Sequence, residues 1–229
     1  MIGTFAYTLI PVVAVLIGAI VAVLRKPGPA LVSAIQHLAA GVVFAAAAVE
    51  ILPQIMHTAS VPATFIGGVA GVALMLTIKS LEDRWHGPAG LLSAVGIDIF
   101  IDGLVLGLAF LAGAKAGLLL TIALTLEVLF LGLTVTDALG EAIRSKLKIV
   151  ALSGGLALLL PLGALAATPV AALSAAIIAG FLTCGLMALL YLVTEELLVE
   201  AHEKPDSPLI SAMFFVGFLG LLLVEEAIG

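Results

Sequence analysis

Long apolar runs separated by short polar breaks dominate the pattern of this chain. An α-helix needs about 20 predominantly apolar residues to cross the hydrocarbon core of a bilayer. The breaks carry turn signals, such as RKPGP at 25–29, ATP at 167–169 and EKPDSP at 203–208. The pattern predicts an all-α fold of eight transmembrane helices, at residues 4–24, 30–56, 62–80, 89–112, 116–142, 148–167, 170–200 and 208–228.

Composition agrees with a membrane protein. Of the 229 residues, 63% are hydrophobic and 10% are charged, whereas a soluble domain has about 25% charged residues. No loop is long enough for a second domain, so we expect one transmembrane domain over residues 1–229, with the lipid bilayer and not nucleic acid as its partner. Short loops and the absence of a transit peptide favour the inner (cytoplasmic) membrane of a prokaryote.

The basic residues predict an orientation. Eight of the nine follow the first, third, fifth or seventh predicted helix, and Lys115 alone falls on the other side. The positive-inside rule places the richer side in the cytoplasm, so both termini are expected outside. The eight are Arg25, Lys26, Lys79, Arg84, Arg144, Lys146, Lys148 and Lys204.

The stretch GIDIFIDGLVLG, residues 96–107, carries two carboxylates where they are costly. Asp98 and Asp102 are four residues apart on one helix face, and Glu127 lies near the middle of the next predicted helix. A charged side chain at mid-membrane costs roughly 2.5–3.5 kcal/mol on insertion scales. We interpret the three acids as an oxygen cage for a divalent cation. The alternative is that they are protonated, or form hydrogen bonds that fix helix packing.

Polar residues near the helix ends suggest two further metal sites. The seventh helix ends in an acidic segment with one histidine, which is either a cytoplasmic release site or an interfacial helix end. Glu50 and His57 end the second helix and could attract cations at an outer entrance. We interpret His37 as a packed or interfacial residue and not as a ligand. The candidate release site consists of Glu195, Glu196, Glu200 and His202.

Two weak internal similarities suggest an inverted repeat. An acid stands five residues before a glycine in both Asp98–Gly103 and Glu127–Gly132. A glutamate and a histidine stand seven apart in EILPQIMH (50–57) and in EELLVEAH (195–202). The helices of each pair run in opposite senses across the membrane, as expected of an inverted-repeat transporter.

Several segments resemble the ZIP (Zrt/Irt-like) family of divalent metal transporters. They are HLAAGVVFAAAAVEILP (37–53), IDIFIDGLVLG (97–107), LSGGLALLLPLGAL (152–165) and LMALLYLVTEELLVEAH (186–202). Their order and spacing match the family over nearly the whole chain. The resemblance implies eight spans in an inverted-repeat bundle, both termini outside, and alternating-access uptake of a metal ion toward the cytoplasm.

The match to the family's ligands is incomplete. In the fourth helix Asp98 stands where the family usually has histidine, Ile99 replaces an asparagine, and Asp102 fills the acidic position before Gly103. In the fifth helix Glu127 takes the ligand position. Glu195 and Glu196 match a His-Glu pair of the seventh helix. Apolar residues replace a proline and two acids of the family at Phe130, Leu131 and Leu160.

These departures imply one metal site instead of two, with carboxylate ligands in place of histidine. Such a site favours Mn²⁺, Fe²⁺ or Mg²⁺ over Zn²⁺. The metal is a substrate, no further cofactor is expected, and a homodimer is one candidate assembly. The sequence contains no HExxH or GxSxG motif, so an enzyme is not expected. The alternatives are a non-transporting metal sensor or scaffold, and a proton-linked transporter of another cation.

Overall fold

The computed structural model describes residues 2–82, 88–203 and 207–228, and within these ranges the chain is helical and contains no strand. Three short segments depart from α-helix: η1 and η3 are π-helical and η2 is a 3₁₀-helix. The elements are α1 (Ile2–Leu24), α2 (Pro29–Ala46), η1 (Ala47–Ile51), α3 (Leu52–Thr58), α4 (Val61–Glu82), α5 (Pro88–Ala112), α6 (Ala114–Ala142), α7 (Lys146–Ala157), α8 (Leu159–Ala166), η2 (Thr168–Ala172), α9 (Ala175–Tyr191), η3 (Leu192–Leu197), α10 (Leu198–His202) and α11 (Pro208–Ile228).

The described elements form eight rods that are long and apolar enough to cross a membrane. Consecutive elements join end to end to make the second, sixth and seventh rods. Large apolar side chains cover the outside, such as Phe65, which is 71% exposed, and Leu223, which is 63% exposed. Such a surface suits lipid and not water. The chain is therefore an integral membrane protein.

One predicted break lies elsewhere. The ATP turn signal at 167–169 does not end the sixth rod, because Thr168–Ala172 continues as the 3₁₀-helix η2. Pro169 stands in the first turn of that helix, where its missing N–H costs nothing. The chain leaves the helix only at Leu173, and Ser174 precedes the start of α9 with extended backbone.

Four helix pairs account for the most extensive packing: α1 with α6, α2 with α11, α4 with α9, and α5 with α8. Glycine permits close backbone contact in each of them. A Cβ atom added at Gly103 of α5 would collide with the Leu160 carbonyl of α8, and one at Gly132 of α6 would collide with the Val15 carbonyl of α1. Close approach of this kind is typical of membrane helices, which gain packing energy from small residues.

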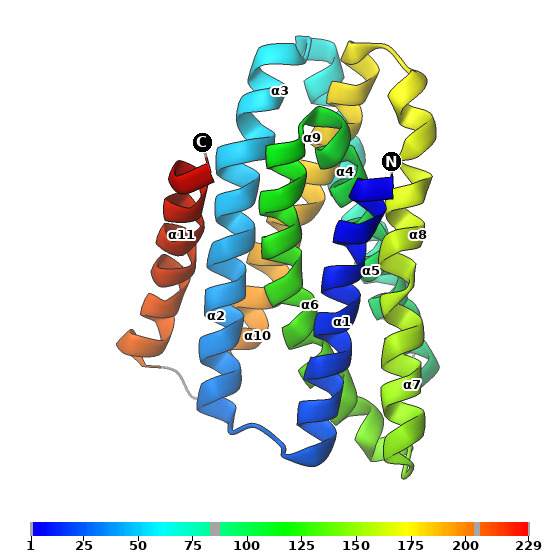
Figure 1. Ribbon diagram of the computed structural model, residues 1–229, viewed down its shortest axis with the longest axis vertical. Helices are drawn as coiled ribbons and strands as arrows, with labels where there is room; N and C mark the ends of the chain where they lie inside the picture. The colour runs from blue at the N-terminus through cyan, green and yellow to red at the C-terminus, as the bar shows by residue number, and fades with distance from the viewer. Residues whose placement is uncertain (1, 83–87, 204–206, 229) are drawn as a thin grey trace.

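The two ends of the bundle differ in charge. The α1–α2 and α6–α7 connections lie at the lower end in Figure 1, and both chain termini lie toward the opposite end. Lys26, Arg144 and Lys146 line one pocket between the lower ends of α1, α6 and α7. Lys115, at the start of α6, instead pairs with Glu225 of α11. Two of the basic residues used for the predicted orientation, Arg84 and Lys204, lie outside the described residues.

Candidate metal centre

Three carboxylates from two neighbouring helices meet inside the bundle. Asp98 and Asp102 lie on α5 and Glu127 on α6, and each offers an oxygen within 4.8 Å of the oxygens of the other two. Asp102 is 2% exposed and Glu127 3% exposed, whereas Asp98 is half-buried. The predicted trio is therefore brought together around one point, and its side chains do not face lipid.

Helix geometry and helix packing together produce this convergence. The four-residue spacing places Asp98 and Asp102 on one side of α5. Because Gly113 alone connects α5 to α6, the two helices form a tight antiparallel pair that brings Glu127 opposite them. On their far sides α5 packs closely on α8 and α6 on α1, which keeps the acids in the interior.

The trio has hydrogen-bonding capacity that the protein leaves unused. Asp102 Oδ2 and Glu127 Oε2 are buried without a hydrogen-bond partner. The charged groups that act on these two carboxyls include each other, Asp98 and Glu196, all of them acids. We call Asp98, Asp102, Glu127 and Glu196 the central acid cluster. Mutual repulsion of buried anions is offset when a proton or a metal ion binds among them.

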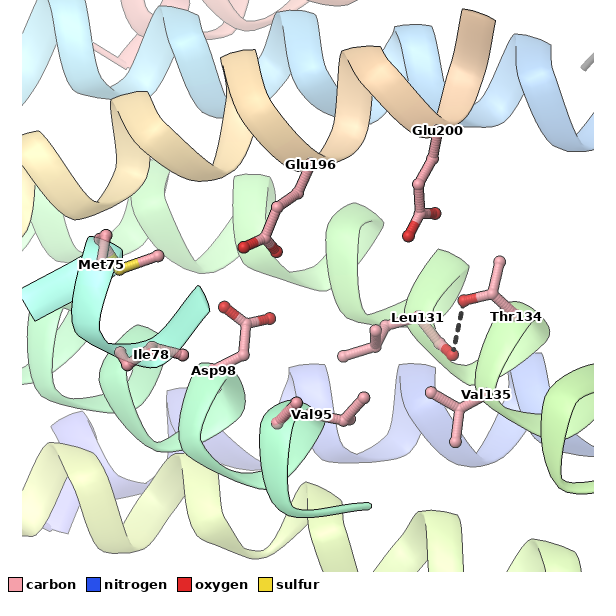
Figure 2. A pocket seen from close by; sticks show the side chains of 10 residues that line it. Met75, Ile78, Val95, Asp98, Leu131, Thr134, Val135, Glu196 and Glu200 are labelled. Atoms are coloured by element: carbon pink, nitrogen blue, oxygen red, sulfur yellow. Dashed lines mark hydrogen bonds between the residues drawn. The ribbon is translucent and has the colours of Figure 1, made fainter. Parts of the chain in front are cut away.

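A cavity of about 200 Å³ opens on one side of the cluster. Figure 2 shows the Asp98 carboxylate pointing across this cavity toward Glu196, with Glu200 further along the same wall. Thr134 of α6 lies opposite Glu200, and its hydroxyl donates to the Leu131 carbonyl at 3.2 Å. The lining residues are Met75, Ile78, Ala94, Val95, Asp98, Leu131, Thr134, Val135, Glu196 and Glu200.

This arrangement suits a hard, partly hydrated divalent cation. Carboxylate oxygens are the ligands preferred by Mg²⁺, Ca²⁺ and Mn²⁺. A water molecule occupies about 30 Å³ in the liquid, so the cavity has room for several waters beside the ion. Asp102 and Glu127 provide dry, fixed oxygens, and Asp98 and Glu196 face the wet side.

The predicted release site is divided by the structure. Glu196 and Glu200 line the cavity of the central acid cluster, and Gln36 of α2 donates to Glu200 Oε2 at 2.8 Å. Glu195 is exposed. His202 packs its ring against His37, with ring centroids 5.0 Å apart. The four residues therefore serve different surroundings, because successive residues of a helix point in different directions.

The predicted entrance residues also have separate surroundings. Glu50 is half-buried in the π-helical segment η1, and Lys115 and Glu225 are the charged groups that act on it. We call Glu50, Lys115 and Glu225 the Lys115 cluster. His57 is exposed on α3.

The positions where the family resemblance implied lost ligands are packed into the protein. Ile99 and Leu160 are each 1% exposed and Phe130 is 2% exposed, whereas Leu131 lines the cavity wall. A second metal beside the trio would therefore meet hydrocarbon at these positions. The arrangement fits a single site.

Sequence reasoning missed two features of the site. Met75 of α4, 3% exposed, contributes a thioether side chain to the cavity wall. Its position in a continuous apolar run gave no signal. Gln36 and His37 of α2 contact the end of the seventh rod, and the signal available was that 37 and 202 fall at the same end of oppositely directed helices.

Comparison with protein-family models and with curated proteins gives no match, so the site is interpreted from its own geometry.

Proposed function

We propose that this protein carries a divalent metal cation across a membrane through a single carboxylate site, as a divergent relative of the ZIP family. The observation that carries the proposal is the buried trio Asp98, Asp102 and Glu127, with oxygens within 4.8 Å of one another. Buried acids in a spanning helix mark ion pathways by default. A divalent ion replaces the water that these oxygens have lost.

The helix packing supports an inverted repeat. A two-fold axis that relates the first three rods to the last three and exchanges α5 with α6 would convert the α1–α6 pair into the α8–α5 pair. The same axis would convert the α2–α11 pair into the α9–α4 pair. These are the four most extensive contacts of the bundle. Repeat symmetry about a central site is the usual basis of alternating access.

The π-helical segments support the same symmetry. η1 interrupts the second rod and contains Glu50, and η3 interrupts the seventh rod and contains Glu195 and Glu196. π-Helical turns are rare and occur frequently at functional sites. Their occurrence in the two rods that the repeat would pair is what an inverted repeat predicts.

Orientation and metal preference complete the proposal. Described lysines and arginines gather at the lower end of Figure 1, which we assign to the cytoplasm by the positive-inside rule. Oxygen ligands favour Mn²⁺, Fe²⁺ or Mg²⁺ over Zn²⁺. Alternating access would move the ion from the Lys115 end toward the basic end.

The test is ion flux into proteoliposomes that contain the purified chain, with Mn²⁺, Fe²⁺, Mg²⁺ and Zn²⁺ offered separately. We expect flux of the hard ions to exceed that of Zn²⁺, and we expect Asp98→His to shift the preference toward Zn²⁺ because imidazole suits zinc. Identical metal profiles before and after this substitution would remove Asp98 from the ligand set. Metal binding without flux would favour the sensor or scaffold, and proton flux alone would favour the proton-linked alternative.

A further inference from the structure

Two histidines meet at the lower end of the bundle, away from the central acid cluster. His37 belongs to α2 and His202 to the last turn of α10. Their rings are 5.0 Å apart between centroids, with an angle of 69° between the ring planes. The contact joins elements 165 residues apart in sequence (202 − 37).

Both rings are held in the tautomer that a metal requires. His37 Nδ1 lies 2.9 Å from the Ser33 carbonyl oxygen, and His202 Nδ1 lies 2.6 Å from the Leu198 carbonyl oxygen. A carbonyl only accepts, so each Nδ1 carries the proton and each neutral ring has its lone pair on Nε2. Metal-binding histidines are oriented by the same kind of bond from the second ring nitrogen.

His37 has a buried nitrogen with no partner in the protein. The residue is 1% exposed, and its Nε2 atom makes no hydrogen bond. Buried polar atoms are generally paired, and an unpaired one calls for a ligand, an ion or a water. His202 is exposed at the end of the helix, so an ion can reach the pair from the aqueous side.

The surrounding contacts fix the distance between the two helices. Ser33 donates from its hydroxyl to the Ala201 carbonyl at 2.9 Å, and Gln36 donates to Glu200 at 2.8 Å. These two bonds join α2 to α10 on either side of the histidine contact. The pair is therefore preorganised, which lowers the cost of binding an ion.

We infer that His37 and His202 form a second metal site, distinct from the central acid cluster, for a borderline divalent ion such as Zn²⁺. Two imidazoles that bind one tetrahedral zinc through Nε2, with Zn–N bonds of about 2.0–2.1 Å, have ring centroids about 5 Å apart. The observed separation of 5.0 Å matches this value. Water fills the remaining positions, so the site binds with modest affinity and exchanges its ion readily. The inference does not depend on transport.

The test is zinc titration of the purified full-length chain in detergent against a chromophoric chelator. The starting protein carries Asp98→Asn, Asp102→Asn and Glu127→Gln together, so that the central trio no longer competes. We expect this protein to retain one zinc, and His37→Gln or His202→Gln to weaken that zinc at least about tenfold, since each removes one of two protein ligands. His57→Gln is the matched control at the opposite end, and it should leave binding unchanged.

A rescue separates ligation from folding. Cysteine is a zinc ligand, so His37→Cys should bind zinc where His37→Gln does not. Co²⁺ bound to the Cys variant should show a thiolate charge-transfer band. Zinc binding that survives His37→Gln, or that disappears with the trio alone, would overturn the inference and leave the histidines as a packing contact. Absence of ion flux with zinc still bound at the histidines would reject only the proposed transport.

Discussion

The Lys115 cluster and the central acid cluster place similar residues in opposite electrostatic settings. Each contains a glutamate from a π-helical segment, Glu50 in η1 and Glu196 in η3. Glu50 has a fixed cation nearby, because Lys115 acts on it and also bonds Glu225 at 2.6 Å. Glu196 instead faces Asp98 across a cavity and acts on Asp102 and Glu127.

The difference shows how one local pattern can serve two purposes. Where a lysine is built in, the acids have their counter-ion permanently and are suited to holding helices together. Where the neighbours are other acids, the counter-ion has to come from outside. A mobile cation is therefore expected at the central acid cluster and not at the Lys115 cluster.

The largest expected effect comes from the buried acids. Asp102→Asn and Glu127→Gln each remove a dry oxygen ligand, and even residues that merely orient ligands change metal affinity by about 10–100-fold. We expect Mn²⁺ flux in proteoliposomes to fall by at least about 100-fold in each variant. Glu226→Gln, which changes an exposed acid at the end of α11, should retain full flux. Normal flux in both buried-acid variants would refute the metal site.

An intermediate effect should separate two adjacent glutamates. Glu196 lines the cavity, whereas its neighbour Glu195 is exposed. Glu196→Gln should reduce Mn²⁺ flux by about tenfold, since it removes a charge that faces the ion without being one of its buried ligands. Glu195→Gln removes the same charge from the same π-helical segment and should change flux little. Equal losses in the two variants would mean that the segment and not the cavity determines the effect.

The smallest effect is expected at Lys115. Lys115→Met removes the partner of Glu225 but leaves the central acid cluster intact, and exposed ion pairs contribute little. We expect Mn²⁺ flux to change by less than about twofold, and any change to disappear at high salt because the charges are exposed. A loss as large as that of Asp102→Asn would place Lys115 in the ion path and end the contrast between the clusters.

Most of the fold was predictable because the bilayer imposes a simple rule on sequence. Seven of the eight predicted spans end within a few residues of the helical rods, apart from fraying of the fifth. The error at 167–169 arose because proline in the first turn of a short helix resembles a break. The π-helical segments left no sequence signal, since they depend on how the second and seventh rods pack.

The site was predictable only in part. Asp98 and Asp102 share a helix face in any α-helix, and Glu127 sits at a matching depth, so their convergence followed from periodicity. The direction of Glu196, the thioether of Met75 in the cavity wall and the contact of His37 with His202 depend on helix rotation and neighbours. Asp137 and Glu141, which continue a polar stripe from Glu127 and Thr134 along α6, have side chains outside the described part of the structure.

By itself, the sequence determined that the chain crosses a membrane eight times and holds three costly acids near mid-depth. Hydrophobic length and helical periodicity are local properties, and the bilayer reads them directly. Only the tertiary structure decided which acids share a cavity, which one has a lysine, and which histidines touch. Those contacts join residues far apart in the chain, and they are set by the close packing of glycine-bearing helices rather than by any one segment.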